Sequence, residues 1–568
     1  MKKRFVSMAL SLLMLVTALA TSACGEEETD DTLTIEGNAA RAMTLSIWGI
    51  KGEGTTDEAI AEVEAAMSKL TEAQFNTAID LVLLEEDEYE KKLEEYMDTI
   101  QARIDAEKAE AEARKKAERE AKKRSETLAT EETEKPEETS DTADETILDE
   151  YGLPTTLYPE VEEDQLDIFL ITDYEMLEKF NEKGVFSSLD EQLNGASKLI
   201  KSYIHPTMIS AGKMNGKTVA IINQQLVGEY TYMLVNKELL EKYYWDIDNI
   251  ATLSDAYQFI LDVEREEPEY QPFVGDISPI NVQYFSLDGQ KTVFGNMLAP
   301  TAVSGDDFTP RFMFQVVNWT RHIKLYKNLD FNNCIGSETF TADDKFGVGI
   351  MKGNANDLAA YEEDYHVVIL QAPQGTTDNI FNGMFAVSTY TKSVARSMEI
   401  ITYLNTRSEI RNIFGYGIEG VHYELDDEGR LTRLNDDYNM KLEYTGNCFI
   451  AHAPDGQTKE YWDLAKDHNI ELVLSPYFKL NITEEDIDME MYAHCLEIAE
   501  DFYADLDECT SEEEVVDLLD EYWELCENDD VAVEWINEAP TLPEDAPEDA
   551  EPPKTIGKFY KDWSKIKK

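Results

Sequence analysis

Strand-like apolar runs alternate with amphipathic helical segments along most of this chain, and this alternation limits the fold more than any other feature. Residues 44–48 and 75–84 predict strands, and residues 55–70 between them predict a helix with one apolar face. The alternation returns at 165–174 and again over 348–406. Alternating strands and helices favour parallel α/β layers. We therefore expect an α/β fold.

The N-terminal residues have the pattern of an export signal. Basic residues at 2–4 precede an apolar run over 8–19, and small residues then lead to Cys24. This order is typical of a secretory signal, and the run is shorter than the about 20 apolar residues that span a bilayer. Cys24 resembles the lipobox cysteine of bacterial lipoproteins, which carries acyl chains. We expect residues 1–23 to be a lipoprotein signal peptide; the alternative is an ordinary signal peptide followed by a chance cysteine.

The charge of the chain excludes one class of partner. Lysine and arginine together number 50 and aspartate and glutamate 117, which gives a net charge of -67. Nucleic-acid binding requires basic side chains that neutralise phosphates, so we expect no nucleic-acid partner. Anionic lipid would repel such a chain, so an acyl anchor rather than a basic patch would hold it at a membrane.

No sequence motif supports catalysis, a cofactor or a metal. The glycines around 347–349 do not continue into a dinucleotide fingerprint, and Walker and G-x-S-x-G motifs are absent. The five cysteines after Cys24 include no C-x-x-C pair, which predicts neither a zinc site nor a disulfide framework. Buried thiols and one local bridge in the C-terminal region are the two alternatives. A glycoside hydrolase, which needs two carboxylates facing each other across a cleft, is the best enzyme alternative.

Composition also separates segments from the α/β body. Residues 24–42 form an acidic tether, and residues 85–150 form an insertion that starts as a long helix and ends in a polar run with little to bury. Past Ile104 the helix alternates acidic and basic residues, which indicates a solvated half. A coiled-coil partner arm is the alternative. A helical C-terminal region follows 463, and 539–568 is expected to be an unpacked tail.

Several short blocks resemble, in order, the landmarks of extracellular solute-binding proteins of ABC importers. The similarity is to the sugar-binding branch, family 1-like, and to its long lipoprotein members from Gram-positive anaerobes. It covers about 43–423 without the charged insertion. The blocks are Asp167-Ile-Phe-Leu, Val185-Phe-Ser-Ser-Leu-Asp190, Asn215-Gly-Lys217, Tyr232-Met-Leu-Val-Asn-Lys-Glu238, Met384-Phe-Ala-Val-Ser-Thr-Tyr-Thr-Lys392 and Arg411-Asn-Ile-Phe-Gly-Tyr416.

The resemblance implies a two-lobed periplasmic-binding-protein-like (type II) fold with a hinge and a ligand cleft. Lobe one would comprise 43–222 and 383–415, and lobe two with the helical C-terminal region 223–382 and 416–538. It further implies a monomeric, lipid-anchored protein on the extracellular face of the cell membrane. Such a protein captures a mono- or oligosaccharide and delivers it to an ABC permease. A surface adhesion lipoprotein that uses the charged helix as an arm is the alternative.

Candidate ligand contacts are polar and aromatic residues at strand ends and at crossings between the lobes. Sugar rings need planar aromatic faces and fixed amide, carboxylate or lysine groups. Each candidate also has a plain structural alternative, such as a helix N-cap for Asp173 and ordinary packing for Tyr423. The candidates are Lys51, Asp173, Tyr174, Gln224, Gln225, Tyr230, Tyr284, Lys352, Asn354 and Tyr423.

Overall fold

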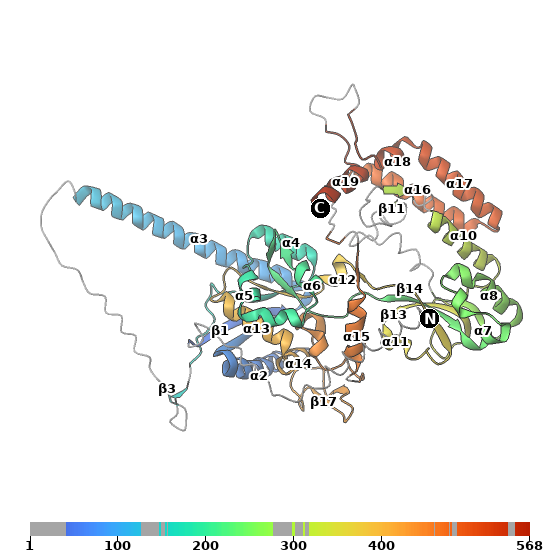
Figure 1. Cartoon of the computed structure of the whole chain (residues 1–568). Coiled ribbons are helices and arrows are strands. Elements are labelled where there is room, and N and C mark those ends of the chain that lie inside the picture. The colour runs from blue at the N-terminus through green and yellow to red at the C-terminus, as the bar shows by residue number, and fades with distance from the viewer. Residues whose placement is uncertain are drawn as a thin grey trace, which may run out of the picture. The chain divides into compact units, whose positions relative to one another are not determined.

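Lobe one contains a five-stranded sheet in the order β2-β1-β5-β16-β8. Strand β1 of this sheet is labelled in Figure 1. Strand β1 pairs in parallel with β2 and β5, and β16 runs antiparallel between β5 and β8. All four residues of β5 are buried, as expected for a central strand covered on both faces. The strands are β1 (Met43–Ile50), β2 (Thr77–Leu84), β5 (Ile168–Ile171), β8 (Ala220–Ile222) and β16 (Met384–Val387).

This computed structural model describes residues 41–125, 147–148, 154–155, 157–275, 298–300, 310–312, 317–458, 460–475, 478–479, 485–542 and 551–567. Ala42–Lys568 forms one compact unit. Cys24 and Tyr284 lie outside the described residues. No helix in the described part of the chain is long and apolar enough to cross a bilayer.

The helices of lobe one follow the predicted periodicity. In α2, the side chain of Thr56 accepts a hydrogen bond from the backbone N–H of Ala59, and Ile60, Val63 and Met67 are buried. The prediction of a helix after the first strand is therefore confirmed. The helices are α2 (Asp57–Phe75), α3 (Glu86–Ser125), α4 (Tyr174–Lys183), α5 (Asp190–Asn194), η1 (Ala196–Ser202), α6 (Pro206–Ala211), α13 (Val394–Thr406) and α14 (Ser408–Tyr416).

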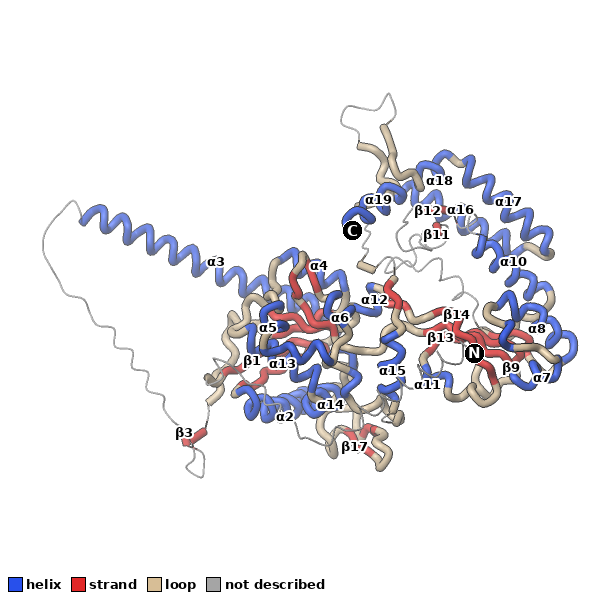
Figure 2. Tube along the Cα trace, in the orientation of Figure 1, coloured by secondary structure: helices blue, strands red, loops and turns tan. Residues whose placement is uncertain are grey.

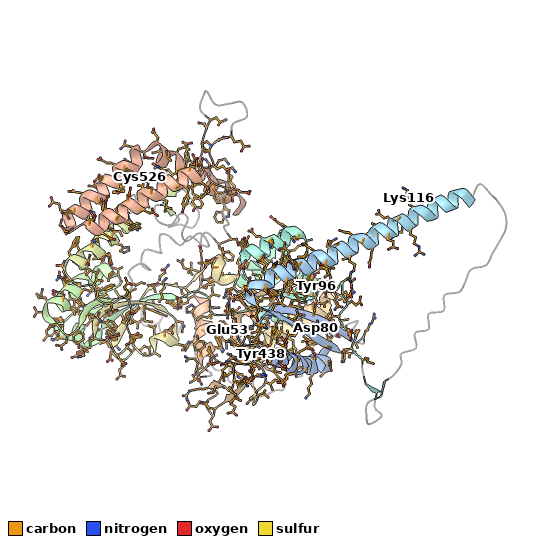
Figure 3. All side chains as sticks on the ribbon, turned by 180° about the vertical axis from the view of Figure 1, so that it is seen from behind. Glu53, Asp80, Tyr96, Lys116, Tyr438 and Cys526 are labelled. Atoms are coloured by element: carbon orange, nitrogen blue, oxygen red, sulfur yellow. The ribbon has the colours of Figure 1, made fainter. Side chains whose placement is uncertain are left out.

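The first half of α3 is part of lobe one. Tyr89, Leu93, Met97 and Ile100 are buried, and the Tyr89 hydroxyl donates to the carbonyl oxygen of Leu170 at 2.9 Å. Residues 105–116 are exposed, and Lys116 marks this half in Figure 3. The predicted change from a packed to a solvated half is confirmed, but the packed half belongs to the lobe rather than to a protruding insertion.

Lobe two contains a four-stranded sheet in the order β10-β13-β9-β14. Strand β13 pairs in parallel with β10, and β9 is antiparallel to both β13 and β14. Helices α7 and α8 contribute Leu239, Leu253, Phe259 and Val263 to the core beneath this sheet. The elements are β9 (Tyr230–Asn236), α7 (Lys237–Tyr243), η2 (Ile247–Asn249), α8 (Leu253–Glu266), β10 (Gln271–Val274), α10 (Val317–Phe331), β13 (Phe346–Gly353), α11 (Ala355–Leu358) and β14 (Tyr365–Gln371).

The C-terminal helices form a module with its own core. Figure 2 shows the segments of this module as helices. Helix α10 joins this core to lobe two, because Trp319 packs in the module and Leu329 in the lobe. The expectation of an unpacked tail is wrong for 556–567, where Ile556 and Tyr560 are buried. Apolar residues recur there at helical spacing, so the segment forms a packed helix although its composition is basic. The helices are α16 (Met489–Glu508), α17 (Glu512–Asn528), α18 (Asp530–Trp535) and α19 (Ile556–Lys567).

Residues 417–450, which follow α14, pack on lobe one rather than on lobe two. The backbone N–H of Gly52 donates to the carbonyl oxygen of Asn439 at 2.7 Å, and Arg411 donates to Leu442 at 2.7 Å. The predicted small hairpin is present as β17 (Tyr423–Leu425) and β18 (Leu431–Arg433). Other short elements are β3 (Ile147–Leu148), β4 (Pro154–Thr155), β6 (Lys213–Met214), β7 (Lys217–Thr218), β11 (Leu298–Pro300), β12 (Pro310–Phe312), η4 (Leu442–Tyr444) and η5 (Cys448–Ile450).

Candidate functional site

Two chain segments cross between the sheets, and helix α15 (Tyr461–Ile470) packs against them. The first crossing runs from β8 to β9 through 223–229, and the second runs from β14 to β16 through β15 (Gln374–Gly375) and α12 (Thr377–Ile380). They approach closely at Gly228, which has a φ of 67° and where a Cβ would lie 2.6 Å from the carbonyl oxygen of Gln374. Only glycine fits such a contact without strain.

Helix α15 is fixed to the first crossing by amide side chains. Asn469 accepts from the backbone N–H of Val227 at 3.0 Å and donates to the carbonyl oxygen of Gln225 at 2.6 Å. The ring of His468 contacts the carbonyl oxygen of Gly228 at 2.9 Å. Strand β19 (Val473–Leu474) then pairs with β15 of the second crossing. Helix α15 and the strand that follows it therefore hold both crossings.

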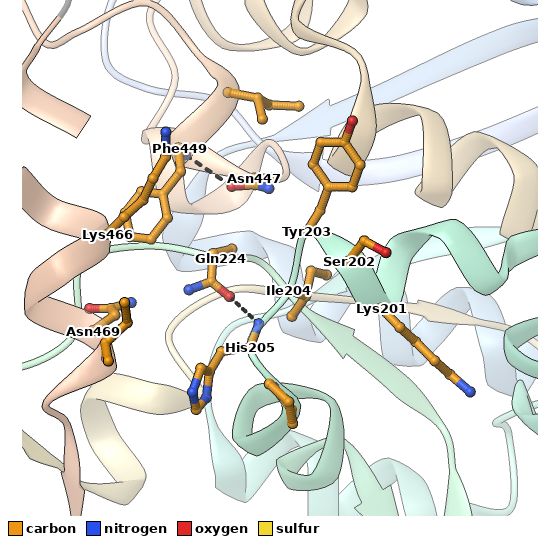
Figure 4. A pocket seen from close by; sticks show the side chains of 13 residues that line it. Lys201, Ser202, Tyr203, Ile204, His205, Gln224, Asn447, Phe449, Lys466 and Asn469 are labelled. Atoms are coloured by element: carbon orange, nitrogen blue, oxygen red, sulfur yellow. Dashed lines mark hydrogen bonds between the residues drawn. The ribbon is translucent and has the colours of Figure 1, made fainter. Parts of the chain in front are cut away.

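A pocket of about 430 Å³ lies beside this junction, and we call it the crossing pocket (Figure 4). Its walls come from the end of η1, the start of α6, the first crossing, η5 and α15. Its size falls within the range of small-molecule sites. The lining residues are Lys201, Ser202, Tyr203, Ile204, His205, Pro206, Gln224, Asn447, Phe449, Ile450, Lys466, Asn469 and Ile470.

The pocket contains aromatic rings, amide oxygens that accept hydrogen bonds from the protein, and polar groups that have no partner among the described residues. Gln224 is buried, and its side-chain oxygen accepts from the backbone N–H of His205 at 2.8 Å. The oxygen of Asn447 accepts from the backbone N–H of Phe449 at 2.9 Å. Within the described residues, the amide nitrogen of Gln224 and the hydroxyl of Tyr203 have no hydrogen-bond partner, and Tyr203 is 39% exposed. These two groups can meet a ligand without breaking a protein contact.

Among the predicted contacts that the structure describes, Gln224 alone lines the crossing pocket. Its neighbours on the first crossing make hydrogen bonds within the protein. The side chain of Gln225 donates to the carbonyl oxygen of Asn382 at 2.5 Å. The hydroxyl of Tyr230 donates to Glu471 at 2.8 Å. Burial and the neighbouring carboxylate of Glu471 raise the pKa of Tyr230 to about 12. Both side chains are less than a tenth exposed.

Several other predicted contacts have local structural roles. Asp173 is the N-cap of α4, where its carboxylate accepts from the backbone N–H of Met176. Asn354 forms a capping box with Asp357 at the start of α11. Such caps are the structural alternative expected for these residue types.

Three further predicted contacts lie apart from the pocket. Lys51 forms an ion pair with Glu85 at 3.1 Å, and Lys352 is exposed on β13. Tyr423 is buried with Tyr416 in a small core beside the β17–β18 hairpin. The sequence predicted this group as one site, and the structure does not bring it together.

Tyr174 belongs to a separate aromatic cluster at the carboxyl end of β5. Its ring lies 4.8 Å from that of Phe381, which stacks on Phe478 at 5.4 Å. The ammonium group of Lys479 lies 5.5 to 5.9 Å from all three ring centroids and donates to the carbonyl oxygen of Ala211 at 2.7 Å. Burial lowers the pKa of Lys479 to about 8, although Glu178 opposes this effect.

Sequence reasoning missed most of the pocket. Tyr203 and His205 lie in a helical stretch with no motif, and Phe449 and Asn469 lie far from Gln224 in the sequence. No spacing rule brings these segments together. Within the described residues no group of three or more His, Cys, Asp or Glu side chains is placed to hold a metal ion.

The comparisons with known proteins agree with this architecture. No protein-family model matches the chain. A carbohydrate ABC transporter substrate-binding protein of Streptococcus pneumoniae is 22% identical over 335 residues, which are 55% of this chain and 66% of the relative. The chain thus spans slightly less than two thirds of that relative.

A solved structure shows the same fold. The crystal structure of an N-glycan transport solute binding protein from Streptococcus pneumoniae matches with a TM-score of 0.52 and 18% identity. The match covers 93% of this chain and 100% of that one. The similarity predicted from the short sequence blocks is confirmed, and the chain has the two-lobed α/β fold of that solute binding protein.

Proposed function

We propose that this protein captures a carbohydrate outside the cell and delivers it to the permease of an ABC importer. The observation that carries the proposal is the pair of α/β sheets joined by two crossings, in a fold that matches a glycan-transport binding protein over 93% of the chain. The curated relative is itself a carbohydrate substrate-binding protein. Proteins of this design close around a solute because the solute binds the closed state better.

The crossing pocket is the site that we assign to the solute. Tyr203 and Phe449 offer aromatic faces for the C–H surface of a sugar ring, and the amide of Gln224 and the hydroxyl of Tyr203 offer hydrogen bonds. Lys201 and Lys466 add donors at the pocket. The assignment rests on this combination of aromatic ring surface with polar groups that have no hydrogen-bond partner among the described residues.

We further propose that Cys24 carries the lipid anchor and that the protein works as a monomer on the extracellular face of the membrane. The basic and apolar order of residues 2–19 supports export, and the small residues before Cys24 support acylation. Mass spectrometry of the protein recovered from its native membrane checks this, because an acylated N-terminal peptide would begin at Cys24. A peptide that continues through residue 23 would contradict it.

The protein is proposed to bind its sugar without changing it. The relatives are described as binding proteins, whereas a glycoside hydrolase would require two facing carboxylates at a defined separation. None of the described residues that line the pocket is an Asp or a Glu. The surface-adhesion alternative does not need two lobes connected by crossings.

A thermal-shift screen of the chain from residue 25 onward tests the proposal. Mono- and oligosaccharides, including N-glycan fragments, are compared with amino acids and peptides at millimolar concentration. A ligand at 100 times its dissociation constant stabilises the fold by about 2.7 kcal/mol. We expect a raised midpoint with at least one saccharide and recovery of that saccharide intact. Recovery of a cleaved sugar would favour the hydrolase, and a shift only with peptides would replace the carbohydrate proposal.

A further inference from the structure

Helices α16 and α17 form a hairpin that carries two buried cysteines. Cys495 is 4% exposed on α16, and Cys526 is 1% exposed on α17. Both belong to the same core cluster of the C-terminal module, which includes the labelled Cys526 in Figure 3. The structure holds both as free thiols.

The register of the hairpin places the two cysteines at the same level. The helices are joined by the short segment 509–511. Cys495 precedes Thr510 by about 15 residues and Cys526 follows it by about 16, so at about 1.5 Å of rise per residue each lies about 23 Å from the turn. Both side chains face the shared core at the open end of the hairpin, where no turn connects the helices.

A hydrogen bond between neighbouring residues supports this register. His494, next to Cys495, contacts the carboxylate of Asp529 at 3.0 Å, and Asp529 lies one helical turn after Cys526. Burial raises the pKa of the Cys495 thiol to about 12, and the nearby Cys526 contributes to that rise. Both thiols therefore lie in the same part of this core.

The other described cysteines do not compete for this pairing. Cys509 lies at the turn, about 21 Å along α16 from Cys495. Cys334 belongs to the core of lobe two, and Cys448 to a core beside α15. Within the described residues, Cys495 and Cys526 are the two cysteines that share one level of one core.

We propose that Cys495 and Cys526 form a disulfide that closes the open end of the α16–α17 hairpin in the exported protein. The inference rests on the extracellular location in the proposed function, since disulfides persist in oxidising compartments. Both thiols lose their protons and an S–S bond forms, while the disulfide of an extracellular thiol oxidant takes up the two electrons and two protons and becomes two thiols.

The acidic charge of the hairpin opposes its folding, and a covalent link between the helices would offset this effect. No lysine or arginine lies between Lys479 and Lys554, and acidic residues occur throughout that stretch. Their mutual repulsion opposes the compact module.

Alkylation of the full chain tests the proposal, with Cys24→Ser introduced to remove the sixth cysteine. The protein is refolded with oxidised and reduced glutathione, denatured, alkylated with iodoacetamide and weighed. We expect three alkylated cysteines without reductant and five after reduction, with a linked peptide that joins Cys495 to Cys526. Five alkylated cysteines without reductant, or a different linked pair, would overturn the proposal.

Matched variants separate this bond from a general effect of losing a thiol. In a Cys495→Ala background all four remaining cysteines should be alkylated without reductant, whereas Cys334→Ala should leave two alkylated. Reductant should lower the unfolding midpoint of the parent and not that of Cys495→Ala. If a variant does not fold, the count on the parent chain still decides. Because no count depends on a sugar, failure here is distinct from failure of the proposed function.

Discussion

The hydroxyl of Tyr230 on β9 donates a hydrogen bond to the carboxylate of Glu471, at the end of α15, at 2.8 Å. The two residues lie 241 positions apart in the chain. Their contact joins the strand that follows the first crossing to the helix that packs against it. Tyr230 was predicted as a ligand contact, and its burial makes this internal bond its clearest role.

Replacing Tyr230 with Phe removes that bond and leaves the ring. A hydrogen bond to a charged group contributes about 1.5–3 kcal/mol, so we expect Tyr230→Phe to lower the free energy of unfolding by about 2 kcal/mol, measured by urea titration. Tyr232→Phe is the matched control, because Tyr232 stacks on Tyr230 and its hydroxyl has no partner among the described residues. Equal losses in the two variants would contradict this role.

A buried carboxylate holds lobe one together. Asp167 is fully buried and accepts from the backbone N–H of Ser46 at 2.9 Å, from Gln165 at 2.7 Å and from Thr391 at 2.6 Å. Asp167→Asn turns an amide N–H toward donors, and we expect a loss of about 3 kcal/mol in unfolding free energy. The near-surface Asp164→Asn should cost less than about 1 kcal/mol. Similar unfolding midpoints for both variants would refute the account.

Lys479 gives a pH-dependent contribution whose sign is fixed. Burial lowers its folded pKa to about 8 from a usual value near 10.5, so the unfolded chain holds the proton more tightly. The free-energy cost of burying the charged amine is fully present below pH 8 and disappears as the pH rises through about 10.5. Relative to Lys479→Met, the parent chain should therefore gain stability between these pH values. A difference that stays constant with pH would show that the amine is not desolvated.

The sheets could be predicted from the sequence because their signals are local. The runs at 44–48 and 165–174 are apolar and β-branched, and β1 and β5 appear there. The period of α3 also revealed where its packed half ends. The last helix, α19, was not predicted, because the basic composition of the segment indicated an unpacked tail although its apolar residues recur at helical spacing.

The candidate site could be predicted only in part because it joins segments that are distant in sequence. Gln224 was found through its place at a crossing, whereas Tyr203 and Asn469 carry no signal of their own. Asp173 and Asn354 were attractive because polar residues at strand ends bind ligands, but the same residue types cap helices. A single sequence does not distinguish these roles.

The crossing pocket predicts a selective loss of sugar binding. Tyr203→Ala removes the exposed ring and hydroxyl, and we expect affinity to fall at least tenfold, about 1.4 kcal/mol, without a change in the unfolding midpoint of the free protein. Tyr244→Ala is the control, because Tyr244 is 95% exposed and does not line the pocket. Unchanged affinity in Tyr203→Ala would move the site to the Tyr174 cluster, where Tyr174→Ala would then be tested in the same way.

The most direct test of the central claim is calorimetric titration of the folded chain with the saccharide that gives the largest thermal shift, followed by mass analysis of the sugar. The account predicts saturable one-to-one binding and a sugar of unchanged mass. A folded protein that binds no saccharide in the panel, or that returns a cleaved sugar, would contradict the assignment as a carbohydrate-capturing binding protein.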